Sequence, residues 1–224
     1  MCKSNQEVNW HLLNAVNSEK RMHPYLEEFP NEPICALEMY LWNSQISAQF
    51  WQVIGFTEIA LRNRIDQQLS RRSSVPGYSW FQDPKIVRPG SLTARKVAKA
   101  SDLLRRSGKY VSHERLLTEL NLSFWQQLVS RANRNLWPDI SRGFATQKAI
   151  TPETFAELVE EFHQFRNRIA HHNKIWHLDL YAKYLVMIEI LEHLDPQFSA
   201  LVMREVLILD YLANGPNCRS LAGE

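Results

Sequence analysis

The sequence predicts an all-α fold, a helical bundle with one loop excursion that contains proline and glycine. Apolar residues recur with the period of about 3.6 residues that places them on one face of a helix, and capping residues stand before most of these segments. Only 7 glycines occur among 224 residues, which argues against a turn-rich all-β protein.

The longest predicted helix covers residues 35–70. Gly55 inside it marks either close packing or a bend. Residues 73–91 follow as a loop with turns, because three dipeptides there pair proline with glycine or aspartate. The apolar stripe of the long helix is expected to contain Leu37, Tyr40, Leu41, Trp51, Ile54, Leu61 and Ile65.

Shorter helices are predicted for the rest of the chain. Thr151 is the clearest start, because a hydroxyl cap is followed by Pro152 in the first turn and by Glu153 near the positive end of the helix dipole. The other predicted segments are a basic helix from Ser91 or Thr93 to about Ser107, a short helix from Ser112, a helix from Ser123 to Trp137, one over residues 178–193 and a last one from Asp195 to about Ala213.

Composition narrows the class of protein. The formal net charge is only +2, so any nucleic-acid binding must come from a local patch. The three cysteines, Cys2, Cys35 and Cys218, are scattered and odd in number, which favours reduced thiols over a disulfide scaffold. No uncharged run is long enough to span a membrane, and the first residues lack the apolar core of a signal peptide. We therefore expect a cytoplasmic protein with no membrane partner.

Residues 166–172, Arg-Asn-Arg-Ile-Ala-His-His, are the most informative stretch. Arg166 supplies a permanent planar cation that can grip phosphate oxygens. A histidine side chain such as that of His171 can move protons, and Asn167 can orient a partner by hydrogen bonding. Together they form a compact set of groups for handling a phosphodiester.

The helical geometry of this stretch leaves two arrangements open. His163, Asn167 and His171 follow one another at steps of four, so they line one face of a continuous helix. Arg166 and His171 are five residues apart, about 140° around an ideal helix. Either the long arginine spans that gap, or the helix breaks near Ala170 and His171.

Each feature also has a purely structural interpretation. Arg166 and His171 could be a helix-terminal cation with a stacked histidine. Glu58 and Arg62 have the spacing of an ordinary helical ion pair, which we favour over a role beside the motif. Trp42, Trp51, Trp125 and Trp137 are expected in the core, although one or two could stack bases. The basic helix, with Arg95, Lys96, Lys99, Arg105 and Arg106, either lines an RNA path or is a solvated face.

A zinc site is the rival functional interpretation, since His163, His171, His172 and His177 could gather around a metal. No cysteine pair lies nearby, and the spacing matches no standard zinc pattern. We therefore expect no metal and no other cofactor.

Three blocks of sequence, in order between about residues 37 and 195, carry a family resemblance. Residues 165–172, Phe-Arg-Asn-Arg-Ile-Ala-His-His, resemble the terminal motif of the Abi-like proteins, a branch of the HEPN superfamily linked to abortive phage infection. The long first helix of the family is matched by residues 37–43 and 58–63, and its central segment by residues 120–125 with Leu136-Trp137. A glycine usual in the central block is absent at residues 121–123, and Asn173-Lys174 replace an acidic-Pro pair.

The resemblance implies a HEPN-type helical bundle over residues 35–213, with additional helices. An N-terminal extension over residues 1–34, helical and packed on the bundle, and a tail over residues 214–224 complete the expected organisation. The family fold is usually dimeric, so a homodimer is expected, and many members are metal-independent RNases.

By motif position, the resemblance makes Arg166, Asn167 and His171 the catalytic residues. Residues with RNA-binding or supporting roles would be Arg168, His172, Glu58, Arg62 and Asn63. The expected activity is that of a toxin or anti-phage endoribonuclease, controlled by an antitoxin protein or a structured RNA. The alternative is a non-catalytic HEPN module that binds RNA or another protein.

Overall fold

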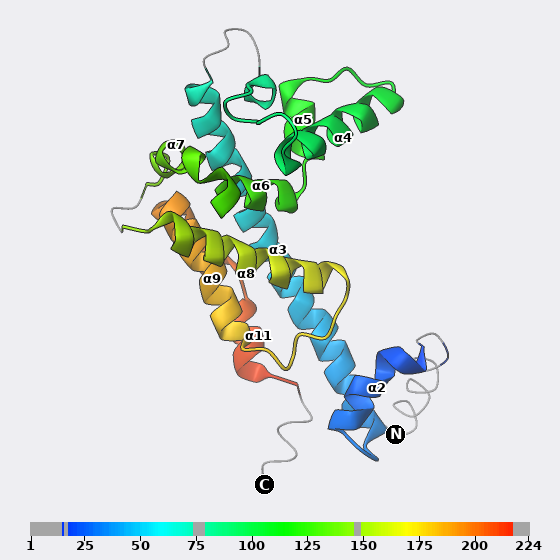
Figure 1. The fold of residues 1–224 in the computed structure, drawn as a ribbon. Coiled ribbons are helices and arrows are strands. Elements are labelled where there is room, and N and C mark those ends of the chain that lie inside the picture. Colours follow the sequence, from blue (N-terminus) through cyan, green and yellow to red (C-terminus); the bar gives the residue numbers. More distant parts are fainter. Residues whose placement is uncertain (1–14, 16–17, 74–78, 146–148, 217–224) are drawn as a thin grey trace. The chain divides into compact units, whose positions relative to one another are not determined.

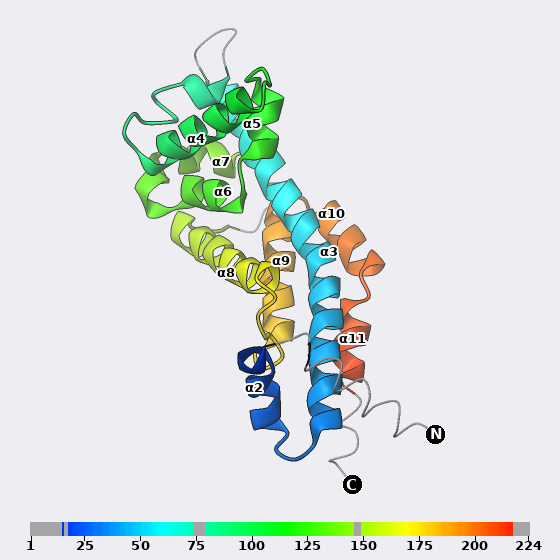
Figure 2. The same cartoon turned by 90° about the vertical axis from the view of Figure 1, so that its right-hand side faces the viewer.

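The computed structural model describes residues 15, 18–73, 79–145 and 149–216, and all regular structure there is helical, as predicted. Figures 1 and 2 label the α-helices in two orthogonal views. The elements are α2 (Glu19–Glu28), α3 (Pro33–Arg72), η1 (Trp80–Gln82), α4 (Leu92–Arg106), α5 (His113–Glu119), α6 (Leu122–Val129), η2 (Arg131–Leu136), α7 (Trp137–Ser141), α8 (Pro152–Ala170), α9 (Leu180–Leu194), α10 (Pro196–Glu205) and α11 (Ile208–Asn214).

The chain divides into two units. The first unit comprises Met1–Trp51, Arg168–Tyr181 and Val206–Glu224, and the second comprises Gln52–Asn167 and Ala182–Glu205. Helices α3, α8 and α9 continue without interruption through the points where the chain passes from one unit to the other (Figures 1 and 2). The division into an N-terminal extension, a bundle domain and a tail stays a prediction.

The core of the first unit is built around Tyr25 of α2. Its ring meets that of Tyr40 edge-on at 5.4 Å and lies 6.3 Å from that of Trp176. Burial raises the pKa of Tyr25 to about 12, because removing the phenol from water disfavours its charged form. Ala36 and Met39 of α3 complete this core, and Trp42 packs against it as predicted.

Two groups of aromatic rings fill the second unit. The ring of Trp80 contacts that of Phe81, with centroids 4.0 Å apart, and the α6 rings of Phe124 and Trp125. The other group joins α7, α8 and α9 through Trp137, Phe144, Phe155 and His193. The predicted core position of Trp125 is confirmed, whereas Trp137 is only partly buried and packs against the rings of Phe144 and Phe155.

Helix α3 confirms the long predicted helix but corrects its apolar stripe. Leu41 and Trp51, expected in the core, are 45% and 47% exposed. The buried stripe instead passes through Asn43 and Thr57, which are polar and were therefore not recognised as core positions. At Gly55 an added Cβ would meet no atom within 4 Å, so this glycine does not serve close packing.

Capping signals predicted the helix starts well. The hydroxyls of Ser91, Ser112 and Thr151 accept the backbone N–H groups of Ala94, Arg115 and Thr154, at 3.1, 3.3 and 3.1 Å. Turns and η1 occupy the described part of the predicted loop, while Pro76-Gly77 lies outside the described residues.

Two predicted helices are wrong in extent. The helix expected from Ser123 to Trp137 is α6, which follows Asn121 and stops at Val129, with η2 and α7 after it. Pro138 lies in the first turn of α7, where its missing N–H has no intrahelical partner to lose. The last predicted helix is divided into α10 and α11.

Cys35 is disulfide-bonded, so the expectation of reduced thiols is wrong at this position. In the described part of the chain, no helix combines the length and the apolar composition that crossing a membrane requires.

Candidate active site at the end of helix α8

Helix α8 places the first half of the motif beside its buried face. Phe155, Val159 and Phe162 are buried and hold this helix in the second unit. Arg166 follows Phe162 by four residues and therefore lies on the same face as the core residues. This position explains why its side chain is only 26% exposed. A cation placed there needs a partner, since burial of an uncompensated charge is costly.

Glu58 of α3 is that partner. Its Oε2 lies 3.5 Å from Arg166 Nε, and the Glu58 side chain is also 26% exposed. On its other side, Arg166 Nη1 donates to Asn167 Oδ1 at 3.5 Å. Asn167 Nδ2 in turn donates to His163 Nε2 at 3.1 Å. A continuous line of contacts therefore runs from His163 through Asn167 and Arg166 to Glu58, and it fixes the guanidinium.

His163 accepts a hydrogen bond only when Nε2 carries no proton, and its surroundings favour that state. Burial is the largest cause that lowers the pKa of His163 below its ordinary value of 6.5. The charges of Lys96 and Arg166 lower this pKa further, while Glu160 and Glu58 oppose the shift. His163 is therefore neutral near neutral pH and can hold the Asn167 amide.

The helix ends immediately after this line, as one of the two predicted arrangements required. The last helical residue is Ala170, and His172 adopts a left-handed backbone with φ of 53°. The N–H of His172 donates to Ile169 O at 2.9 Å, and the N–H of Asn173 donates to Arg168 O at 2.8 Å. This pair of bonds is the Schellman helix end, which satisfies carbonyls that would otherwise lack partners.

His171 and His172 are both exposed on the turn that follows, which we call the double-histidine turn (residues 171–177). Other elements of the first unit hold it in place. Arg21 of α2 donates from Nη2 to His172 O. The buried Asn43 of α3 accepts the N–H of Ile175 at 2.8 Å. The backbone of the turn is therefore tied to both N-terminal helices.

Arg168 also holds the turn. Its Nη2 donates to Lys174 O at 2.9 Å and lies 3.5 Å from His177 Nε2. Burial, followed by the charges of Arg168 and Lys174, lowers the pKa of His177. Arg168 is thus a structural tether of the turn as well as a candidate for contact with phosphate.

The region described above falls within a match to a protein family. A model of the Abi-like protein family matches residues 17–177, which include α2, α3, α8 and the double-histidine turn. The chain belongs to the Abi-like protein family. Membership suggests an abortive-infection function and is consistent with a nuclease role. No curated protein and no solved structure gives a significant match.

The predicted site residues of this Abi-like protein fall in both units, because the boundary lies between Asn167 and Arg168. Arg166, Asn167 and Glu58 are brought together in the second unit. The residues that the first unit contributes are Arg168, His171 and His172.

The expected ion pair between Glu58 and Arg62 is wrong. Glu58 pairs with Arg166, and Arg62 Nε donates to Asn63 Oδ1 at 3.2 Å. Arg166 is buried enough to need the carboxylate, whereas an exposed pair one helical turn apart gains little energy in water. Arg62 and Asn63 therefore form a local contact of their own.

Three residues of this region were not predicted as part of the site. His163 had a signal, the step of four residues to Asn167. Asn43 had a weaker one, a polar residue in the middle of an apolar stripe. Arg21 had none, because nothing near it in the sequence indicates a bond to residue 172.

The basic helix α4 of the Abi-like protein is partly committed to structure. Lys96 Nζ donates to the carbonyl and the hydroxyl of Ser123, at 2.7 and 2.8 Å. Desolvation by burial lowers the pKa of Lys96. Arg105 pairs with Asp102 at 2.9 Å. Lys96 therefore anchors α4 to α6 and is not an open phosphate contact.

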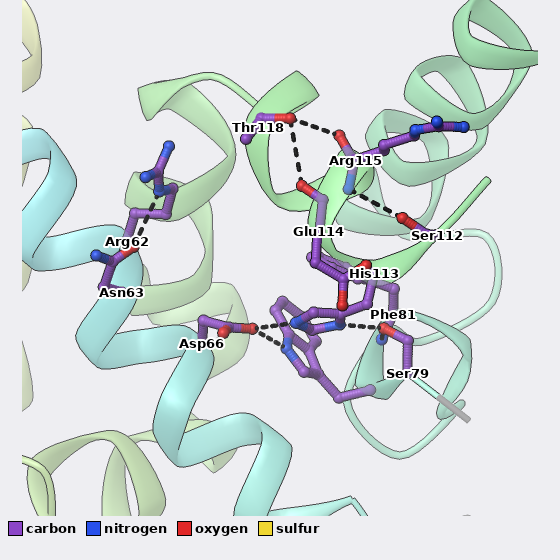
Figure 3. A network of polar contacts seen from close by, with 11 residues as sticks. Arg62, Asn63, Asp66, Ser79, Phe81, Ser112, His113, Glu114, Arg115 and Thr118 are labelled. Carbon is purple, nitrogen blue, oxygen red and sulfur yellow. Dashed lines mark hydrogen bonds and ion pairs between the residues drawn. The ribbon is translucent and has the colours of Figure 1, made fainter. Parts of the chain in front are cut away.

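A second polar cluster contains serine, histidine and aspartate (Figure 3). Ser79 Oγ lies 2.7 Å from His113 Nδ1, and His113 Nε2 lies 3.0 Å from Asp66 Oδ1. Asp66 also accepts the indole N–H of Trp80 at 2.7 Å, while the Ser79 hydroxyl accepts the N–H of Phe81 at 3.3 Å and caps η1. We interpret this cluster as a tether of η1 to α3 and α5.

No three histidine, cysteine, aspartate or glutamate side chains of the described residues gather as a potential metal-binding group. The second unit instead offers a fixed guanidinium and an amide, and the first unit offers exposed imidazoles. These are groups for binding phosphate and moving protons.

Proposed function

We propose that this Abi-like protein is a metal-independent endoribonuclease of the HEPN type that acts as a toxin or anti-phage effector. The observation that carries the proposal is the pairing of Arg166 with Glu58 and Asn167 at the end of a helix whose next residue is the exposed His171. A guanidinium held in one orientation is prepared to bind an anion without further ordering of its side chain.

The chemistry follows from RNA itself, which carries its own nucleophile. The 2′-hydroxyl attacks the adjacent phosphorus, the bond to the 5′-oxygen breaks, and the proton lost by the hydroxyl is balanced by one delivered to the leaving oxygen. His171 serves as the acid or base, a contribution typically worth about 10²–10⁴-fold in rate. Arg166 stabilises the charge that develops on the phosphoryl oxygens, and Asn167 orients it. The products are a 2′,3′-cyclic phosphate and a 5′-hydroxyl end.

In this proposal the protein is a cytoplasmic homodimer under the control of an antitoxin protein or a structured RNA. Two-fold symmetry supplies a second His171, so one imidazole acts as base while its mate acts as acid. A single imidazole would have to change protonation state within the reaction.

The test is cleavage of single-stranded RNA in the presence of a chelator. Wild-type protein should cut the RNA and leave cyclic phosphate ends, and DNA of the same sequence should stay intact because it lacks the 2′-hydroxyl. Arg166→Ala and His171→Ala should each abolish cutting. Matched controls are Arg204→Ala and His23→Ala, which remove an exposed arginine and an exposed histidine elsewhere.

RNA that stays intact but is bound equally by wild type and both site variants would indicate the alternative, a non-catalytic module. Dimeric catalysis has its own signature, a rate that falls faster than linearly with dilution. A strictly linear rate from a proven monomer would remove the two-copy mechanism.

A further inference from the structure

Two hollows open in the first unit beside the double-histidine turn, and Arg21 lines both. The smaller, which we call the cationic hollow, has a volume of about 290 Å³. Its charged lining consists of Lys20, Arg21, Arg168 and Lys174, and no acidic side chain is among its lining residues in the described part of the chain. Four cations around one hollow are a site for a phosphate group, because each can donate charge-assisted hydrogen bonds.

The larger hollow, which we call the aromatic hollow, has a volume of about 660 Å³, within the range of small-molecule sites. Trp51 lines it and is 47% exposed, although a tryptophan is more often kept inside a fold. Ser44 and Ser47 also line this hollow, two helical turns and one before Trp51, and the Ser47 hydroxyl donates to Asn43 O at 2.6 Å. His172 also lines this hollow, so the hollow reaches the double-histidine turn.

The shared residue relates the two hollows chemically. Arg21 donates one N–H to His172 O, and a guanidinium has five such donors. The remaining donors can face a phosphate in the cationic hollow while the arginine stays bound to the turn. A planar, partly polar ring against Trp51 and a phosphate beside Arg21 are the two parts of one nucleotide.

We propose that the first unit binds one nucleotide step of single-stranded RNA at the double-histidine turn, with the phosphate in the cationic hollow and the unpaired base against Trp51. This inference rests on the proposed nuclease function and names its substrate as unpaired RNA. A base can enter the aromatic hollow only when it is free of a partner strand, so duplex RNA binds poorly. Stacking on an indole accepts any base, so the site carries little sequence preference.

Binding of fluorescein-labelled oligoadenylate to the His171→Ala protein separates the two hollows. Trp51→Ala should weaken binding by roughly 5- to 100-fold, the loss of one stacked base, and Trp51→Phe should restore most of it. On an abasic ribose-phosphate chain of equal length, Trp51→Ala should have no effect. Lys20→Ala and Lys174→Ala should weaken both probes and should each lower the slope of log affinity against log salt by about 0.7.

Two exposed residues outside both hollows, Tyr181 and Lys85, provide matched controls, and their alanine variants should bind like the parent. Equal losses in the control variants, or an equal effect of Trp51→Ala on both probes, would overturn the two-hollow site. So would dissociation of a dimer by Trp51→Ala in sedimentation, because the hollow would then hold a second copy of this chain. Helical signal and melting temperature check that each variant folds.

The nuclease proposal and the nucleotide-site proposal can be contradicted separately. Intact RNA with the predicted binding pattern would remove the enzyme and keep the site. Cleavage with an unchanged KM in the Trp51, Lys20 and Lys174 variants would keep the enzyme and remove the site.

Discussion

The carboxylate of Glu58 on α3 lies 3.5 Å from Nε of Arg166 on α8, with both side chains 26% exposed. At this degree of burial the pair is neither a solvated surface contact nor a fully desolvated one. Its main effect is geometric, because the carboxylate keeps a long side chain in one orientation. The carboxylate also competes with an incoming phosphate for the same cation.

Glu58→Gln should therefore slow the chemical step without weakening substrate binding. The amide keeps the shape of the side chain but releases the guanidinium, so kcat should fall about tenfold, equivalent to about 1.4 kcal/mol of transition-state stabilisation. KM should not rise, because the competing charge is gone. Steady-state cleavage kinetics measure both values, and Glu157→Gln, an exposed carboxylate on α8, is the control. An unchanged kcat would show that Arg166 needs no orientation.

Asn43→Ala should destabilise the fold through residues far away in the sequence. The variant leaves the N–H of Ile175 buried without its acceptor, which costs about 1–3 kcal/mol. Urea unfolding should show that loss, whereas Gln45→Ala, on the exposed side of the same helix, should change the free energy of unfolding by less than about 0.5 kcal/mol. Equal stability of the two variants would mean that the bond contributes nothing.

At His172 glycine should be more stabilising than alanine, the reverse of the usual order in helices. The backbone there has φ of 53°, and a Cβ in the left-handed region costs about 1–2 kcal/mol. His172→Gly should therefore unfold at higher urea than His172→Ala, although both lack the imidazole. At Ala170, inside the helix, substitution by glycine should destabilise. Thermal melts of the three variants show whether each glycine substitution raises or lowers stability.

Acid should destabilise the fold through His163. Burial lowers the pKa of this histidine below 6.5, so the unfolded chain binds more protons than the folded one between the two pKa values. The free energy of unfolding therefore falls as pH drops through about 6.5 toward the lower, folded pKa, and it recovers above that window. His163→Gln should flatten part of this slope, and His177, whose pKa is also lowered, accounts for another part. Urea unfolding at several pH values measures this dependence. If the free energy of unfolding changed with pH equally in the wild type and in His163→Gln, the role of His163 would be contradicted.

Asp66→Ala removes the acceptor shared by Trp80 and His113. Trp80 is 1% exposed, so its indole N–H would be left without a partner in the core. A loss of about 1–3 kcal/mol of stability is expected, without a matching loss of RNA binding. Ser79→Ala should cost less, because Asp66 remains to hold both rings. A loss of RNA cleavage in a variant of normal stability would instead assign this cluster a functional role.

Local signals in the sequence predicted the local structure. The caps at Ser91, Ser112 and Thr151 form the bonds that their residue types indicate, because capping depends on neighbours within three residues. At the end of α8 the spacing of Arg166 and His171 left two arrangements open, and the structure shows the one in which the helix ends at Ala170. These predictions needed no knowledge of the rest of the chain.

Contacts between distant segments account for the errors. Arg62 lies one helical turn from Glu58, yet Glu58 pairs with Arg166. The reason is that a partly buried cation gains more from a carboxylate partner than an exposed cation does. Asn43 is a core residue because its amide meets a backbone N–H 132 positions later. Trp51 was assigned to the core by its place on the predicted apolar stripe, yet it lines a hollow. Burial of polar groups and exposure of aromatic ones are decided by tertiary partners that local patterns do not identify.

The tethers of the double-histidine turn impose an order on folding. The bonding partners of Arg21 and Asn43 lie 151 and 132 positions further along the chain. Closing such long loops is entropically unfavourable until many contacts form together. A nascent polypeptide exposes α2 and most of α3 well before Ile175 leaves the ribosome, since synthesis proceeds at about 5–20 residues per second. The turn can therefore acquire its ordered form only late in translation, so a chain still being made lacks the geometry with which the finished one would attack RNA.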